Sequence, residues 1–134
     1  MRKKHDSGKK KILVIEDDRL FSDIYAAKFA EEGFDVLLAA DGEEGRAKLV
    51  AEKPDVVLLD IMLPKITGID LLELIRKHED ERVKAMPVIV VTNLSRDQYE
   101  ARIRAYGIEA YFLKSDVLFS QVLAKIQEIF SRKK

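Results

Sequence analysis

The sequence predicts an α/β protein whose parallel β-sheet is covered by helices on both faces. Five short apolar runs rich in Ile, Leu and Val alternate along the chain with longer segments of helical periodicity. One run, residues 56–59, is an unbroken series of Val and Leu, as expected of a strand that is buried on both faces. Such alternation favours a doubly wound sheet whose strands are joined by right-handed helical crossovers.

The predicted strands are short and are bounded by charged or turn-forming residues. They cover residues 11–15, 34–38, 56–59, 88–91 and 110–113. Pro54 ends the helical segment before the third strand, and Pro87 starts the fourth. Because ligands of such sheets bind outside the carboxyl ends of the strands, the residues that follow each run are the candidate site residues.

Five helices are predicted between and after these strands. They cover residues 19–32, 41–52, 68–77, 96–106 and 117–130, and a polar connection follows the third of them through Arg82. Gly33 is suited to end the first helix and Asp41 to cap the second. The side chains expected to face the core are Phe21, Ile24, Tyr25, Phe29 and the stem of Lys28 in the first helix, Ile69, Leu71, Leu72, Leu74 and Ile75 in the third, and Val117, Leu118, Val122, Leu123, Ile126, Ile129 and Phe130 in the last.

Length and composition are those of a single folded domain. The chain has 134 residues, 47% of them apolar, and its 24 basic residues balance its 24 acidic ones. A net charge of zero provides no general attraction to nucleic acid or to an anionic membrane. The absence of cysteine excludes a thiol nucleophile, a disulfide framework and a thiolate metal site.

The ends of the chain carry no recognisable targeting segment. No apolar stretch is long enough for a signal peptide or a membrane span, so we expect a cytoplasmic protein. Residues 1–10 are expected to form a basic tail and residues 11–131 the folded domain. Because little chain follows residue 131, we expect the domain to act alone, without an output domain.

Acidic residues follow two of the predicted strands. Glu16 and Asp17 come directly after the first strand, and Asp60 directly after the third. If these strands are neighbours, the three carboxylates converge, and two like charges about 4 Å apart repel by roughly 4 kcal/mol at an effective dielectric near 20. Such a cluster takes up a proton or a cation, and oxygen ligands favour Mg²⁺ over zinc. Asp18 is better suited to capping the helix that follows.

Two more polar residues complete the predicted site. Thr92 follows the fourth strand and Lys114 the fifth. With Asp60 as the nucleophile, a carboxylate oxygen attacks phosphorus to give an acyl phosphate. Lys114 offsets charge on the transferred group, and the Thr92 hydroxyl donates to a phosphoryl oxygen. The set predicts Mg²⁺-assisted phosphoryl transfer onto an aspartate.

Four motifs contain these residues: Ile-Leu-Val-Ile-Glu-Asp-Asp, Asp-Val-Val-Leu-Leu-Asp-Ile-Met-Leu-Pro, Pro-Val-Ile-Val-Val-Thr and Tyr-Phe-Leu-Lys, with Gly68 after the second. Through them the chain resembles, over residues 11–131, the receiver domain of two-component response regulators. The resemblance implies a flavodoxin-like sheet of five parallel strands in the order 2-1-3-4-5 with five helices. It also implies that Asp60 is the phosphoacceptor and Lys114 the lysine of the family's site.

The resemblance assigns further roles. The implied Mg²⁺ ligands are Glu16, Asp17, Asp60 and the backbone carbonyl of Met62, and the implied switch pair is Thr92 and Tyr111. The implied phosphodonor is a histidine kinase or a histidine phosphotransfer protein. On phosphorylation Thr92 is expected to swing toward the phosphoryl group and Tyr111 to turn inward. This rearranges the fourth helix, fifth strand and fifth helix, a face for an unidentified protein target or a homodimer.

Two positions depart from the family pattern. Ser115 stands where receivers usually carry proline, often after a cis bond. A cis bond before a non-proline residue costs about 2.5–4 kcal/mol, so either the bond is trans and the loop is shifted, or the strain is retained. Ser115 or Asp116 is also a candidate cap for the last helix. Asn93, where a small residue is common, predicts an altered lifetime of the acyl phosphate, in a direction left open.

Other interpretations change what the domain does. It is expected to be a signalling switch rather than an enzyme, since it catalyses only its own phosphorylation and dephosphorylation. A phosphorelay intermediate, or a degenerate receiver that acts only through interaction or dimerisation, fits the same fold. A dehalogenase-type phosphatase needs a second Asp two places after the first, where this chain has Met62. A flavin-binding protein needs a Ser/Thr/Gly-rich loop after residue 15, which is absent here.

Overall fold

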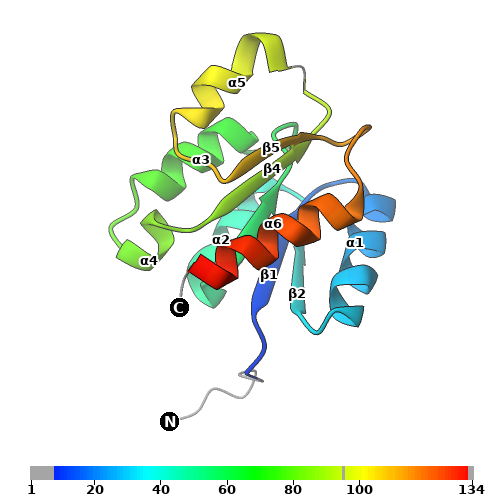
Figure 1. The fold of residues 1–134 in the computed structure, drawn as a ribbon. Helices are drawn as coiled ribbons and strands as arrows, with labels where there is room; N and C mark the ends of the chain where they lie inside the picture. Colours follow the sequence, from blue (N-terminus) through cyan, green and yellow to red (C-terminus); the bar gives the residue numbers. More distant parts are fainter. Residues whose placement is uncertain (1–7, 95, 133–134) are drawn as a thin grey trace.

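A computed structural model of the chain describes residues 8–94 and 96–132, so most of the predicted basic tail, residues 1–7, lies outside the described residues. Five parallel strands form one sheet in the order β2-β1-β3-β4-β5 (Figure 1). The strands are β1 (Lys11–Ile15), β2 (Asp35–Ala39), β3 (Val56–Leu59), β4 (Val88–Thr92) and β5 (Ala110–Leu113). The predicted strand order is therefore confirmed.

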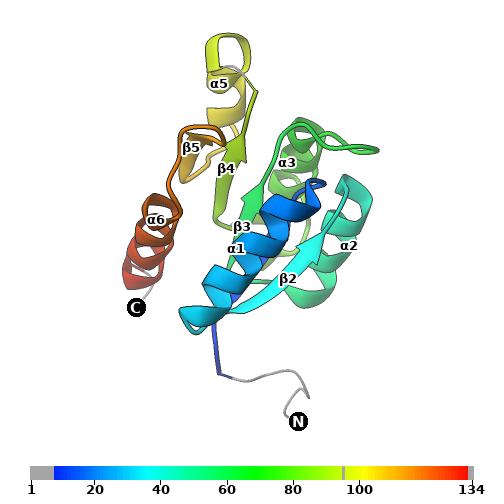
Figure 2. The ribbon, with the colours of Figure 1, turned by 90° about the vertical axis from the view of Figure 1, so that its right-hand side faces the viewer.

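Helices cover both faces of the sheet. They are α1 (Arg19–Glu31), α2 (Gly42–Glu52), α3 (Gly68–Arg76), α4 (Glu81–Lys84), α5 (Arg96–Arg104) and α6 (Phe119–Arg132). Two views at right angles show α1 and α6 on one side of the sheet and α2, α3 and α5 on the other (Figures 1 and 2). In the described part of the chain, no helix is both long enough and apolar enough to cross a membrane.

Two apolar clusters, one on each face, hold these helices to the sheet. Alternate residues of a strand point to opposite faces. Leu13 and Ile15 of β1 therefore belong to the cluster that includes residues of α2, α3, α4 and α5, whereas Ile12 and Val14 belong to the cluster that includes residues of α1 and α6. All four residues of β3 are buried, as predicted for a strand covered on both sides.

The register of the strands brings their carboxyl ends to one edge of the sheet. Ile15 of β1 is aligned with Leu59 of β3, and Thr92 of β4 with Leu113 of β5. After β1 the chain moves outward to β2 and then returns to β3 on the other side of β1. The ends of β1 and β3 thus form the topological switch point at which such sheets bind ligands.

The prediction of five helices omits α4, which makes six in the described residues. This four-residue helix begins near the end of the segment predicted as a polar connection. The Asp80 side chain accepts hydrogen bonds from the N–H groups of Arg82 and Val83, at 2.8 and 3.3 Å, and Val83 is buried in the core. A single turn is too short to show helical periodicity, so only its cap signals it.

Three apolar side chains predicted to face the core are exposed instead: Ile24 (44%), Leu74 (46%) and Leu118 (64%). Ile24 and Leu74 each lie about 100° around a helix from a buried neighbour, Tyr25 or Ile75. Leu118 precedes α6, which begins two residues later than predicted.

The start of α6 also differs from prediction, because neither Ser115 nor Asp116 caps it. Leu118, which directly precedes the helix, donates its N–H to the Gln121 side chain at 2.8 Å. The N–H of Asp116 instead closes a turn onto the Leu113 carbonyl.

Candidate functional site

Three carboxylates meet where β1 and β3 end. Oxygens of Glu16, Asp17 and Asp60 all lie within 4.8 Å of one another. The Asp60 N–H donates to the Ile15 carbonyl at 3.1 Å, and the Glu16 N–H to the Ala39 carbonyl at 2.9 Å, so main-chain bonds to neighbouring strands fix both positions. Glu16 and Asp60 are buried, whereas Asp17 is exposed. The cluster thus has one face open to solvent.

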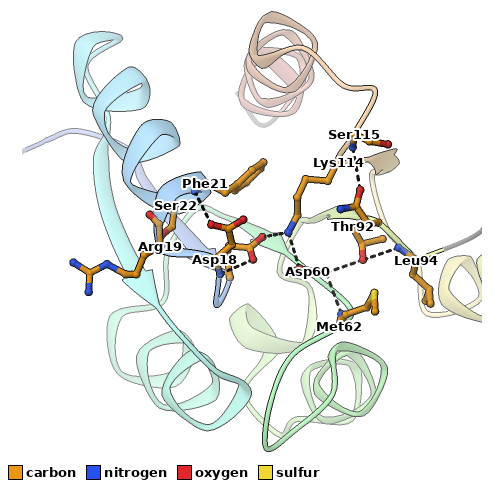
Figure 3. A network of polar contacts seen from close by, with 12 residues as sticks. Asp18, Arg19, Phe21, Ser22, Asp60, Met62, Thr92, Leu94, Lys114 and Ser115 are labelled. Atoms are coloured by element: carbon orange, nitrogen blue, oxygen red, sulfur yellow. Dashed lines mark hydrogen bonds and ion pairs between the residues drawn. The ribbon is translucent and has the colours of Figure 1, made fainter.

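Asp60 is the residue on which the polar contacts of the site converge (Figure 3). Its Oδ1 accepts the Thr92 hydroxyl at 2.7 Å and the Met62 N–H at 3.0 Å. Its Oδ2 accepts Lys114 Nζ at 3.0 Å. Three residues at the ends of different strands therefore bind one carboxylate: Thr92, the last residue of β4, Met62 after β3 and Lys114 after β5.

Lys114 lies between the acidic residues and an aromatic ring. Its Nζ is 2.8 Å from Glu16 Oε1, and it also lies 5.1 Å from the centroid of the Phe21 ring, a cation–π contact. Burial lowers the pKa of Lys114, but its bonds to Glu16 and Asp60 outweigh burial and raise that pKa above its usual value. Lys114 therefore stays charged in this pocket.

Burial perturbs the carboxyl group of Glu16. Burial raises its pKa from 4.5 to about 7, against the opposing effect of Lys114 and of the Asp18 N–H, which donates to Glu16 Oε2 at 2.9 Å. Glu16 Oε1 is buried, and its partner in the described residues is the Lys114 ammonium group, an ion pair at 2.8 Å. Three carboxylates within 4.8 Å of one another, with one ammonium group to offset their charge, fit a hard divalent cation bound through oxygen.

Close packing of a glycine fixes the loop that carries Asp60. A Cβ at Gly68 would lie 2.4 Å from the Ile61 Cα, and the Gly68 N–H donates to the Ile61 carbonyl at 2.9 Å. Lys65 in the same loop adopts a left-handed conformation with φ of 70°. The loop after β3 is thereby held against the start of α3, and it presents the Met62 backbone to Asp60.

Thr92 and Tyr111 are linked through the loop after β4. The Leu94 N–H donates to Thr92 Oγ1 at 3.2 Å, and the Tyr111 hydroxyl donates to the Leu94 carbonyl at 3.0 Å. Tyr111 is buried, and its hydroxyl is bonded to the protein backbone. Thr92 facing Asp60 with Tyr111 inside is the arrangement that was expected from the sequence only after phosphorylation.

The Lys114–Ser115 peptide bond is trans, which decides between the two alternatives left open by the sequence. Lys114 still reaches both carboxylates from this backbone. Asp18 caps α1 as predicted, since its side chain accepts the Phe21 N–H at 3.2 Å.

Two contacts in the site were not predicted from the sequence. One is the Phe21 ring beside Lys114, and the other is a hydrogen bond from the Ser115 N–H to Asn93 Oδ1 at 3.0 Å. Phe21 was expected only as a core residue of the first helix. Both contacts join segments that are far apart in the sequence, so no local pattern signals them.

Comparisons with known proteins agree with this geometry. The family described as Response regulator receiver domain matches residues 12–126. The DNA-binding dual master transcriptional regulator RpaA of Synechocystis sp. is 34% identical over 123 residues, which are 91% of this chain and 49% of RpaA. The polar-differentiation response regulator DivK of Brucella anthropi is 29% identical over 105 residues, 78% of this chain and 84% of DivK. The chain thus spans about half the length of curated relatives such as RpaA.

A solved structure of a receiver domain agrees with the family match. The response regulator receiver domain protein (CheY-like) from Methanospirillum hungatei superimposes with a TM-score of 0.82 at 31% identity, over 93% of this chain and 97% of that one. Together with the family match over most of the sequence, the fold and the residues at its carboxyl edge show that the chain belongs to the response regulator receiver domain family.

Proposed function

We propose that this receiver accepts a phosphoryl group on Asp60 in a reaction that needs Mg²⁺. The observation that carries the proposal is the convergence on one buried carboxylate of the Thr92 hydroxyl, the Lys114 ammonium and two more acids. Isolated acids at strand ends serve as helix caps, but a cap needs neither a lysine nor a second buried carboxylate.

The proposed metal ligands are Glu16, Asp17, Asp60 and the backbone carbonyl of Met62. When bound, Mg²⁺ neutralises charge on the transferring group and on the acids around it. The Met62 N–H, which donates to Asp60 Oδ1, holds this backbone close to the carboxylate. The exposed Asp17 leaves an open side through which the donor approaches.

The proposed reaction is an in-line displacement at phosphorus. An Asp60 oxygen forms the new P–O bond while the bond from phosphorus to the donor's imidazole nitrogen breaks, and its electron pair stays on the imidazole. Lys114 exchanges its contact with Asp60 Oδ2 for a phosphoryl oxygen, and Thr92 donates to another. The donor is a histidine kinase or a histidine phosphotransfer protein, as the cytoplasmic two-component role implies.

The output proposed for the phosphorylated form is a change in the face made of α5, β5 and α6. Thr92 contacts Asp60, the Leu94 N–H contacts Thr92, and the Leu94 carbonyl contacts Tyr111. A phosphoryl group therefore acts on Tyr111 through one short loop, and it stabilises the arrangement already present here. The partner is a protein target or a second copy of the chain, and the domain works as a switch rather than as an enzyme with a separate substrate.

Intact-protein mass spectrometry tests the proposal. After incubation with acetyl phosphate and Mg²⁺ we expect the gain of one phosphoryl group, and no gain when Mg²⁺ is chelated. Asp60→Asn should abolish the gain. Asp18→Asn is the matched control, because it removes a neighbouring carboxylate while asparagine still caps α1. Equal phosphorylation of Asp60→Asn and the parent would contradict the assignment of Asp60.

A further inference from the structure

A hydrogen bond between a side chain and the backbone joins the loop after β4 to the loop after β5. The Ser115 N–H donates to Asn93 Oδ1 at 3.0 Å, across 22 residues of sequence. One residue earlier in each loop, the Lys114 N–H donates to the Thr92 carbonyl at 2.8 Å. That bond continues the pairing of β4 with β5. The Asn93 side chain thus adds a connection beyond the point where backbone pairing ends.

Each partner in this bond directly follows a residue that contacts Asp60. Thr92 donates to Asp60 Oδ1 at 2.7 Å, and Lys114 to Asp60 Oδ2 at 3.0 Å. Together with the bond from the Lys114 N–H to the Thr92 carbonyl, the bond between Asn93 and Ser115 sets the separation of the two segments from which the hydroxyl and the ammonium group reach the carboxylate.

The donor of this bond exists because residue 115 is not proline. Proline has no N–H, and the peptide bond before Ser115 is trans. Asn93 and Ser115 are also the two positions at which the sequence departs from the receiver pattern. The structure shows that these departures are the acceptor and the donor of a single hydrogen bond.

We propose that Asn93 is a positioning residue for Lys114, acting through the Ser115 amide; this rests on the proposed function. During transfer Lys114 gives up Asp60 Oδ2 in favour of a phosphoryl oxygen, so that contact no longer fixes it. The bond between Asn93 and Ser115 includes no reacting atom and persists through the exchange. It keeps the backbone at the base of the lysine side chain in place while the ammonium group moves, which reduces the reorientation that transfer requires.

The rate of Mg²⁺-dependent phosphorylation by acetyl phosphate tests this role. Asn93→Ala removes the acceptor and Ser115→Pro removes the donor, whereas Ser115→Ala keeps both. We expect the first two variants to be about 5-fold slower than the parent, equivalent to about 1 kcal/mol, and Ser115→Ala to lose much less. The double variant Asn93→Ala/Ser115→Pro should be no slower than the slower single variant, because both changes remove the same bond.

The affinity for Mg²⁺ separates positioning from a general loss of structure. Asn93 is not among the proposed metal ligands, so the dissociation constant for Mg²⁺ should stay within about twofold of the parent value in Asn93→Ala. Disturbance of the whole site would instead lower Mg²⁺ affinity and phosphorylation rate together. A parent-like rate in Asn93→Ala, additive losses in the double variant, or equal losses in Ser115→Ala and Asn93→Ala would each overturn the inference.

Amide hydrogen exchange at Ser115 tests the bond without any phosphodonor. Protection of the Ser115 amide should fall about 5-fold in Asn93→Ala and be retained in Ser115→Ala, with the other amides unchanged. Unchanged protection in Asn93→Ala overturns the inference whether or not the protein accepts phosphate. A parent that accepts no phosphoryl group overturns the proposed function and, with it, the role given to Asn93. An active parent with an equally fast Asn93→Ala overturns the inference alone.

Discussion

At the ends of β1 and β3, main-chain bonds and close packing fix the acidic half of the site, whereas in the other half, at the ends of β4 and β5, side-chain hydrogen bonds add to the backbone pairing of the two strands. Asp60 bonds to the Ile15 carbonyl, and Gly68 packs directly on Ile61. Thr92 is paired with β5 through its backbone, but its hydroxyl contacts Asp60 and the Leu94 N–H, and the side chains of Asn93 and Tyr111 hold the loop that follows.

This difference matches the demands on the two halves. The acids have to stay in place to hold a metal ion, and a sheet edge supplies such rigid positions. Thr92 and Lys114 have to change partners when a phosphoryl group arrives, and hydrogen bonds of side chains break and re-form at small cost. We therefore expect changes in the acidic half to act on metal binding and stability, and changes in the other half to act on rate.

The largest expected effect is the pH dependence that Glu16 gives to the metal-free protein. Its folded pKa, about 7, exceeds its reference value of 4.5, so between these values the folded state binds more protons than the unfolded state. Glu16 therefore contributes roughly 3 kcal/mol to the free energy of unfolding below pH 4.5, and this contribution is lost as the pH rises through 7.

Urea unfolding at pH 5 and pH 8, without metal, measures this loss. The parent should lose more stability between the two pH values than Glu16→Gln, in which this group does not titrate. Saturating Mg²⁺ should remove the difference, because the metal stabilises the ionised carboxylate. Parallel pH profiles for parent and variant would contradict the burial of an acid with a raised pKa.

Removal of the Lys114 charge should slow phosphorylation but strengthen the binding of Mg²⁺. Lys114→Met is expected to slow phosphorylation about 100-fold, since a preorganised charge is lost from the transition state. The same change should tighten Mg²⁺ binding several-fold, because a cation beside the acids is gone. The time course of phosphorylation by intact-protein mass spectrometry and a calorimetric titration with Mg²⁺ measure both. Lys125→Met, which pairs only with the surface Glu128 among the contacts described, is the control. Weaker Mg²⁺ binding in Lys114→Met would reject this division of roles.

Gly68→Ala should destabilise the acidic half by steric conflict. The new Cβ would meet the Ile61 backbone, and relief of such overlap typically costs about 1–3 kcal/mol. Gly107→Ala is the control, because φ there is 80° but the space is open. Both variants should unfold at lower urea concentration, and only Gly68→Ala should bind Mg²⁺ more weakly. Equal Mg²⁺ affinities would show that the loop after β3 does not position the ligands.

The smallest expected effect is that of Tyr111→Phe. The variant removes the hydroxyl that donates to the Leu94 carbonyl and should lower the free energy of unfolding by about 1 kcal/mol. Affinity for Mg²⁺ should be unchanged, because Tyr111 belongs to the other half of the site. Denaturant titrations with and without Mg²⁺ check both statements, and a shift in Mg²⁺ affinity would show that the halves are coupled.

The sequence predicts the rigid half well because its signals are local. The bounds of β1, β3 and β5 agree with prediction to the residue, since each is an apolar run ended by a polar residue. The neighbouring positions of β1 and β3, on which convergence of the acids depends, followed from the family resemblance and are confirmed.

The other half depends on contacts between distant segments, which a single sequence does not encode in any local pattern. The spacing of Asn93 and Ser115 gives no sign that their loops meet, and Tyr111 gives no sign that its hydroxyl finds a carbonyl. The helix α4 was missed for a different reason, since one turn is too short for periodicity.

The most direct test of the central claim is to locate the phosphorylated residue. An acyl phosphate is reduced by borohydride to an alcohol, so reduction of the phosphorylated protein would convert a modified aspartate to homoserine. Peptide sequencing by tandem mass spectrometry should then find homoserine at position 60, only in samples incubated with both Mg²⁺ and phosphodonor. Homoserine at position 17 or 18, or none at position 60 in a protein that has gained a phosphoryl group, would contradict the account.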